Sequence, residues 1–171
     1  RFEESIAEYA QVISEAEAAL RAGAAKPPIS LPTARLEYAR VLSWARRYDE
    51  ALVQLNLLLP EGQQPQPNDV NAMVEKARVL AWQRRYNDAL STYDRALVLD
   101  PADFDARLGK AQVLYWSGRS GQAGDLLRPL LQEQPDNSDA TFMMASIERG
   151  RGHNGRALDL LDKIQGRSDA D

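Results

Sequence analysis

The chain of 171 residues contains no cysteine and only one histidine. Without cysteine it can form no disulfide, no thiolate nucleophile and no cysteine-based zinc site. It also lacks any run of about 18 apolar residues, so the sequence predicts no membrane-spanning helix. The net charge of −4 argues against a nucleic-acid-binding protein, which would carry a basic face or stripe.

Candidate residues for chemistry are equally scarce. His153 lies in a glycine-rich turn, without the positioned partner in the sequence that acid–base catalysis needs. The segment GRSGQAG (118–124) lacks the preceding strand and the closing Lys-Ser/Thr of a phosphate-binding loop. Aspartate and glutamate residues follow no metal-loop spacing. We therefore expect a protein that is not an enzyme, with no catalytic residue, no metal and no cofactor.

What the chain does contain is an internal repeat. Small or β-branched residues recur in columns at intervals of 38, 34 and 34 residues, and each interval holds two segments of helical periodicity. A period near 34 with two helices is the signature of stacked helical hairpins. The columns are Ala34, Ala72, Ala106 and Ala140; Ala39, Ala77, Ala111 and Ala145; Val41, Val79, Val113 and Ile147; and Ala51, Ala89, Ala123 and Ala157.

This pattern resembles the tetratricopeptide repeat family from Pro32 to about Gln165. The family places a small residue in the first helix and an alanine early in the second, then two apolar residues and a closing proline. In the second repeat those places hold Ala77, Ala89, Tyr93, Ala96 and Pro101. The resemblance implies an all-α fold, a right-handed α-solenoid of helix-turn-helix repeats.

The chain is expected to consist of one extra helix followed by four repeats. The expected parts are an amphipathic helix at 1–21 (a preceding half-repeat or a cap), a Pro/Gly linker at 22–32, repeats at 33–69, 70–103, 104–137 and 138–166, and a frayed tail at 167–171. The first repeat ends in a proline-rich loop at 60–68, four residues longer than the period requires. Asp49 and Asn87 are expected as N-caps of second helices.

A second stripe of residues lies on the first helix of each repeat, away from the core columns at about 100° per residue. In tetratricopeptide arrays the first helix lines the concave face, so the resemblance implies a partner-binding groove. Its candidate residues are Glu37, Arg40, Trp44, Glu75, Arg78, Trp82, Gln112 and Trp116. Trp and Arg are common anchors of contact surfaces. Two further interpretations remain open: each Trp packs only within its hairpin, and the Glu–Arg pairs are helix-surface salt bridges.

The favoured function is a non-catalytic scaffold that binds a protein or peptide partner through this concave face. A weaker resemblance, carried by ARVLSWARRYDEAL (39–52) and ARVLAWQRRYNDAL (77–90), is to tetratricopeptide stretches of bacterial envelope proteins in polysaccharide export. It implies, as an alternative, a periplasmic scaffold segment of an exopolysaccharide synthesis or export protein, with an export component as partner. A third hypothesis is an adaptor that forms homo-oligomers through the helix at 1–21.

The sequence leaves the compartment undecided. The lack of cysteine is compatible with an oxidising compartment, so a periplasmic location is favoured over a cytoplasmic one. Because the chain opens on Arg1 rather than Met, we expect it to be a segment of a longer protein.

Overall fold

The structure is a computed structural model that describes residues 2–23, 29–60 and 62–168. Within these residues it contains nine α-helices, one short 3₁₀ helix and no strand. The chain divides into two compact units, Arg1–Pro101 and Ala102–Asp171. Residues 24–28 of the expected linker and 169–171 of the expected tail lie outside the described residues.

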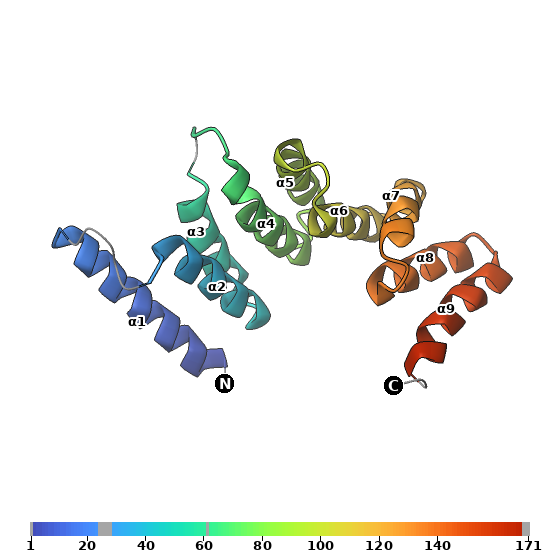
Figure 1. The fold of residues 1–171 in the computed structure, drawn as a ribbon, viewed down its shortest axis with the longest axis horizontal. Coiled ribbons are helices and arrows are strands. Elements are labelled where there is room, and N and C mark those ends of the chain that lie inside the picture. Colours follow the sequence, from blue (N-terminus) through green and yellow to red (C-terminus); the bar gives the residue numbers. More distant parts are fainter. Residues whose placement is uncertain (1, 24–28, 61, 169–171) are drawn as a thin grey trace. The chain divides into compact units, whose positions relative to one another are not determined.

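The first unit consists of one helix followed by two helical hairpins (Figure 1). Helix α1 packs on the first hairpin, and α4 contacts both α2 and α3 of that hairpin. The two parallel first helices, α2 and α4, are therefore neighbours. The elements are α1 (Phe2–Arg21), α2 (Leu31–Trp44), α3 (Tyr48–Leu58), the 3₁₀ helix η1 (Pro67–Asp69), α4 (Val70–Trp82) and α5 (Tyr86–Leu99).

The second unit consists of two further hairpins, α6 with α7 and α8 with α9. Helix α8 contacts both helices of the hairpin before it, as α4 does in the first unit. The elements are α6 (Phe104–Trp116), α7 (Ser120–Glu133), α8 (Ser138–Gly150) and α9 (Asn154–Ser168). All four expected pairs of helices are present.

The repeated columns form the core, as the sequence predicts. All sixteen column residues are buried, and Ala77, Ala89 and Ala111 are 0 % exposed. Two helices can approach to about 8–10 Å only where the side chains at the crossing are small. The alanine columns therefore allow each hairpin to close and to stack on its neighbour within a unit.

Helix α1 buries one face, as its amphipathic pattern predicts. Ile6, Ile13 and Ala16 are buried. On the neighbouring α2, the ring of Tyr38 stacks on that of Tyr9 with centroids 6.3 Å apart. Arg35 of α2 forms an ion pair with Glu17 of α1. Among the described residues, no hairpin precedes α2. Helix α1 covers the face of α2 on which a preceding hairpin would pack.

Two residues after the end of each first helix, one residue has a left-handed backbone conformation. The φ angles are 62° at Arg46 and 63° at Arg84, and 80° and 83° at Gly118 and Gly152. In the second hairpin the backbone N–H of Arg85 donates to the carbonyl of Leu80 at 2.9 Å. This is the bond of a Schellman cap, in which glycine is the usual left-handed residue because a Cβ is strained there. Two corners therefore hold an arginine where glycine would be relaxed.

The N-cap prediction for the second helices was wrong. Helices α3 and α5 begin at Tyr48 and Tyr86, so Asp49 and Asn87 lie inside the first turn. Asp49 instead accepts a hydrogen bond from Nε2 of Gln83 at 2.7 Å, which links the two hairpins of the first unit. Side-chain caps do occur on the first helices of the second unit. The side chains of Asp103 and Asn137 accept hydrogen bonds from the backbone N–H groups of Ala106 and Ala140.

Replacing Arg84 by glycine should stabilise the protein, because the strain of a left-handed L-residue costs about 1–2 kcal/mol and glycine offsets part of that gain through its flexible unfolded state. We expect a net gain of about 0.5–1 kcal/mol in urea unfolding followed by circular dichroism. The reciprocal change Gly118→Ala should cost about 1 kcal/mol. A lower stability of Arg84→Gly would mean that contacts of the arginine side chain stabilise the protein by more than its left-handed backbone conformation destabilises it.

Candidate functional site

Four charged residues of the predicted groove form one connected network in the first unit. Nη1 of Arg40 donates to Glu37 at 2.7 Å, and Nε of Arg40 donates to Oε1 of Glu75 at 3.0 Å. Nη1 of Arg78 donates to the same oxygen of Glu75 at 3.0 Å. We call Glu37, Arg40, Glu75 and Arg78 the charge ladder. The ladder crosses from α2 to α4 and so ties together two successive hairpins.

Glu75 is the centre of the ladder. Its carboxylate is buried, with a side chain 7 % exposed, whereas the two arginines that bind it are 32 % and 38 % exposed. A buried carboxylate is costly unless opposite charges and hydrogen bonds compensate it. Here two guanidinium groups do so, and the four charges of the ladder sum to zero. The ladder is therefore an ordered set of charged side chains that hold one another in place.

The salt-bridge interpretation of the Glu–Arg pairs is confirmed, but it is incomplete. Glu37–Arg40 and Glu75–Arg78 are each three residues apart on one helix, as expected. The bond between Arg40 and Glu75 joins different repeats and was not predicted. Its only signal in the sequence is that both repeats carry the same Glu–Arg spacing.

The three tryptophans have different surroundings. Trp44 of α2 is 59 % exposed, and Trp116 of α6 in the second unit is 40 % exposed. Trp82 of α4 is half-buried, and its ring lies against Tyr48 with centroids 6.0 Å apart and the planes at 36°. Trp82 thus packs on the preceding hairpin while Trp44 presents its indole to solvent. Gln112, the remaining groove candidate, is half-buried on α6 in the second unit.

A pocket of about 780 Å³ adjoins the ladder in the first unit. Thr33, Glu37 and Arg40 of α2 line one side of it, and Asn71 of α4 lines another. Leu57 and Leu58 at the end of α3 contribute apolar surface, as does Pro67 in the long loop at 60–68. The additional loop length at 60–68 is visible in the sequence, but no pattern in it indicates that it adjoins a pocket.

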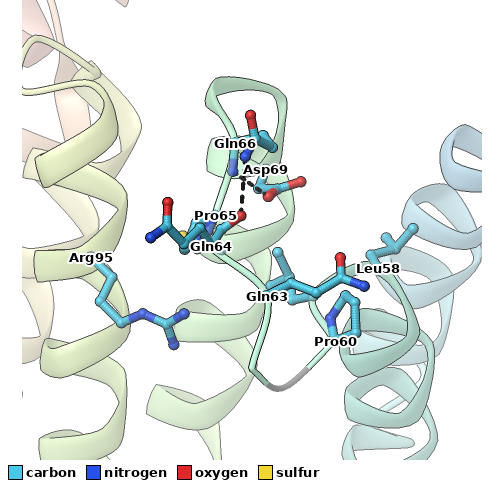
Figure 2. Close-up of a pocket in the computed structure, with 10 residues that line it drawn as sticks. Leu58, Pro60, Gln63, Gln64, Pro65, Gln66, Asp69 and Arg95 are labelled. Carbon is cyan, nitrogen blue, oxygen red and sulfur yellow. Dashed lines mark hydrogen bonds between the residues drawn. The ribbon is translucent and has the colours of Figure 1, made fainter.

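Pro60 and residues 63–66 of the long loop line a second, smaller pocket of about 110 Å³ (Figure 2). The loop is fixed at its end, where the amide of Gln66 donates to Asp69 at 2.6 Å. Met73, which is 1 % exposed, and Arg95 of α5 also line this pocket. A space of this size accommodates water or one small side chain.

The second unit holds a buried carboxylate of its own. Glu148 stands in the column position that Leu42, Leu80 and Leu114 occupy in the other repeats, and it is 8 % exposed. Its carboxylate lies 2.8 Å from Nδ1 of His153 and accepts Nη1 of Arg151 at 3.0 Å. His153, expected to lack a partner, therefore has one. The hydrogen bond from His153, followed by that from Arg151, lowers the pKa of Glu148 despite its burial.

The lowered pKa of Glu148 predicts a loss of stability in acid. A carboxyl group whose pKa is lower in the folded state stabilises the protein above its unfolded pKa of about 4.3, and this contribution disappears as the pH falls through the folded pKa. Between pH 5 and pH 3, the melting temperature of the unaltered chain should therefore fall further than that of Glu148→Gln. At pH 7 the variant should be less stable by about 1–3 kcal/mol.

The control for this experiment is Glu8→Gln, which alters an exposed carboxylate on α1. Glu8→Gln should follow the pH profile of the unaltered chain. Parallel pH profiles for all three proteins would contradict the assignment of acid sensitivity to Glu148.

In the described part of the chain, no group of three or more His, Cys, Asp or Glu side chains could hold a metal ion. Across residues 2–23, 29–60 and 62–168, no helix is both long and apolar enough to cross a membrane. What the ladder, Trp44 and the pocket provide in the first unit is ordered charge, exposed apolar area and a concave space.

Comparison with protein families gives a match over residues 39–171, which is most of the chain, to the cytochrome c-type biogenesis protein H TPR domain, where TPR stands for tetratricopeptide repeat. The chain belongs to this TPR domain family. The tetratricopeptide resemblance is therefore confirmed, whereas the resemblance to polysaccharide-export proteins finds no support in the comparisons. Among curated proteins, none matches the chain.

Solved structures of similar fold are TPR proteins or share their architecture. YrrB, described as a TPR protein with an unusual peptide-binding site, is 21 % identical with a TM-score of 0.68, over 94 % of this chain and 78 % of that one. A TPR protein from Parabacteroides merdae is 15 % identical with a TM-score of 0.71, over 99 % and 68 %. MamA is 15 % identical with a TM-score of 0.69, over 99 % and 90 %. These likenesses confirm the predicted all-α solenoid class of this TPR domain.

Proposed function

We propose that this TPR domain is a non-catalytic scaffold that binds a segment of a partner protein along the first helices of its repeats, and that the partner acts in cytochrome c-type biogenesis. The observation that carries the proposal is the charge ladder beside an exposed Trp44. The family match supplies the process, because its description names cytochrome c-type biogenesis. The TPR fold itself is consistent with protein–protein interaction.

The ladder has the chemistry to hold an extended polypeptide. A guanidinium carries five N–H groups. Arg40 uses Nε and Nη1 within the ladder, and Arg78 uses Nη1. The remaining donors are available to backbone carbonyls of a partner, and they are already oriented by Glu75. Fixing these side chains in advance reduces the entropy cost of binding.

The tryptophan of α2 supplies apolar contact area beside these donors. Trp44 is largely exposed and follows Arg40 by one helical turn, so both lie on the same side of α2. Trp and Arg together are the residues most enriched at energetic centres of interfaces. In the second unit, Gln112 and Trp116 occupy the matching positions of α6, and we propose them as a contact surface of that unit.

The two other hypotheses make different demands. A scaffold in exopolysaccharide export would use the same face for another class of partner, and the family match favours cytochrome c-type biogenesis over it. An adaptor that forms homo-oligomers through α1 would need a free apolar face on that helix. Because α1 already buries Ile6, Ile13 and Ala16 in its own chain, we place the partner on the first helices instead.

Site-specific photo-crosslinking in the native cells tests this proposal. A benzoylphenylalanine at position 44 should give a covalent adduct with a distinct partner, because Trp44 lies on the proposed surface. The matched control is position 98 on α5, where Val98 is 81 % exposed and lies on a second helix. Mass spectrometry of the adduct should identify a protein of cytochrome c maturation.

Three results would count against the proposal. Equal adducts from positions 44 and 98 would show that the first helices have no special role. An adduct with a second copy of the chain would favour the homo-oligomer, and an adduct with a polysaccharide-export protein would favour that alternative.

A further inference from the structure

We propose that the pocket beside the ladder binds a lysine or arginine side chain of the partner segment. This inference rests on the proposed function, because the occupant is part of the bound polypeptide. It assigns a ligand chemistry to the pocket of about 780 Å³ between α2, the end of α3 and the start of α4.

The walls of the pocket suit the stem of a long basic side chain. Leu36 of α2, Leu57 and Leu58 of α3 and Pro67 provide apolar surface around the cavity. Lysine and arginine bury their methylene groups along apolar surface while the charged head stays in a polar environment. The pocket is also large enough to admit the flanking backbone of an extended segment.

The charges in the lining select a cation. The lining holds two carboxylates, Glu37 and Asp69, and one guanidinium, that of Arg40. Arg40 is already shared between Glu37 and Glu75. Asp69 accepts the backbone N–H of Gln66 and has no ion-pair partner among the described residues. The lining therefore has a net formal charge of −1 that a bound ammonium or guanidinium would neutralise.

An acidic ligand is the competing occupant. The pocket lies at the N-terminal ends of α2 and α4, and helix N-termini attract anions. However, Asp69 stands at the start of α4 and already places a carboxylate there. A second anion in the pocket would face Asp69 and Glu37 with only Arg40 to offset them. The charge balance thus favours the basic side chain.

The test is an NMR titration of the ¹⁵N-labelled chain with acetyl-Gly-Gly-Arg-Gly-Gly-amide. The backbone amides of Leu36, Asn68 and Asn71 should shift in a saturable manner. The same peptide with citrulline, which has the shape of arginine but no charge, should bind about tenfold more weakly, the change expected for loss of one charge pair in a partly exposed site. The peptide with glutamate should not bind.

Two variants locate the charge that is recognised. Glu37→Gln and Asp69→Asn each keep a hydrogen-bond acceptor and should weaken binding of the arginine peptide by about three- to tenfold. The matched control is Glu50→Gln, which removes an exposed carboxylate of α3 outside the pocket lining. That variant should leave the affinity unchanged.

Equal binding of the arginine and citrulline peptides, preferential binding of the glutamate peptide, or an unchanged affinity in both pocket variants would overturn the inference. The titration uses no native partner, so it fails separately from the proposed function. An adduct from position 44 without arginine binding would remove only the basic-side-chain pocket. Arginine binding without an adduct would leave the pocket and remove the scaffold role on this face.

Discussion

The small side chains of the alanine columns let neighbouring helices pack closely. The rest of the structure depends on this close packing. The alanine columns are buried in all four hairpins, and at these crossings larger side chains would overpack the core. Since the hairpins within each unit close and stack in the same way, equivalent positions of their first helices come to lie side by side. Within the first unit, this turns the Glu–Arg pair of each helix into part of one surface.

Several local features occur where the repeats depart from uniformity. The extra residues at 60–68 lengthen one connection, and the large pocket adjoins the end of that connection. Glu148 replaces a column leucine and is stabilised by neighbours from the following turn. Arg46 and Arg84 occupy corners where glycine would be relaxed. These features lower the stability locally, and the fold tolerates them because the many contacts of the regular core around them stabilise it.

The amino-acid sequence predicts the fold well, because the residues that recur in each repeat are the ones that are buried in the core. Alanines at fixed intervals and apolar residues at helical spacing are enough to place the hairpins. Salt bridges such as Glu75–Arg78 also follow from spacing along one helix. Features between repeats are harder to predict. The Arg40–Glu75 bond depends on the rotation of α2 relative to α4, and the pocket depends on the path of a loop without periodicity.

The central claim is that charged side chains of successive hairpins are locked into one ordered surface, and a double-mutant cycle between Arg40 and Glu75 tests it most directly. Urea unfolding of Arg40→Met, Glu75→Gln and the double variant measures their coupling free energy. We expect a favourable coupling of about 0.5–3 kcal/mol, as found for residues that share a buried network. Additive effects would show that the two hairpins carry independent charges, and the preordered binding surface would have no physical basis.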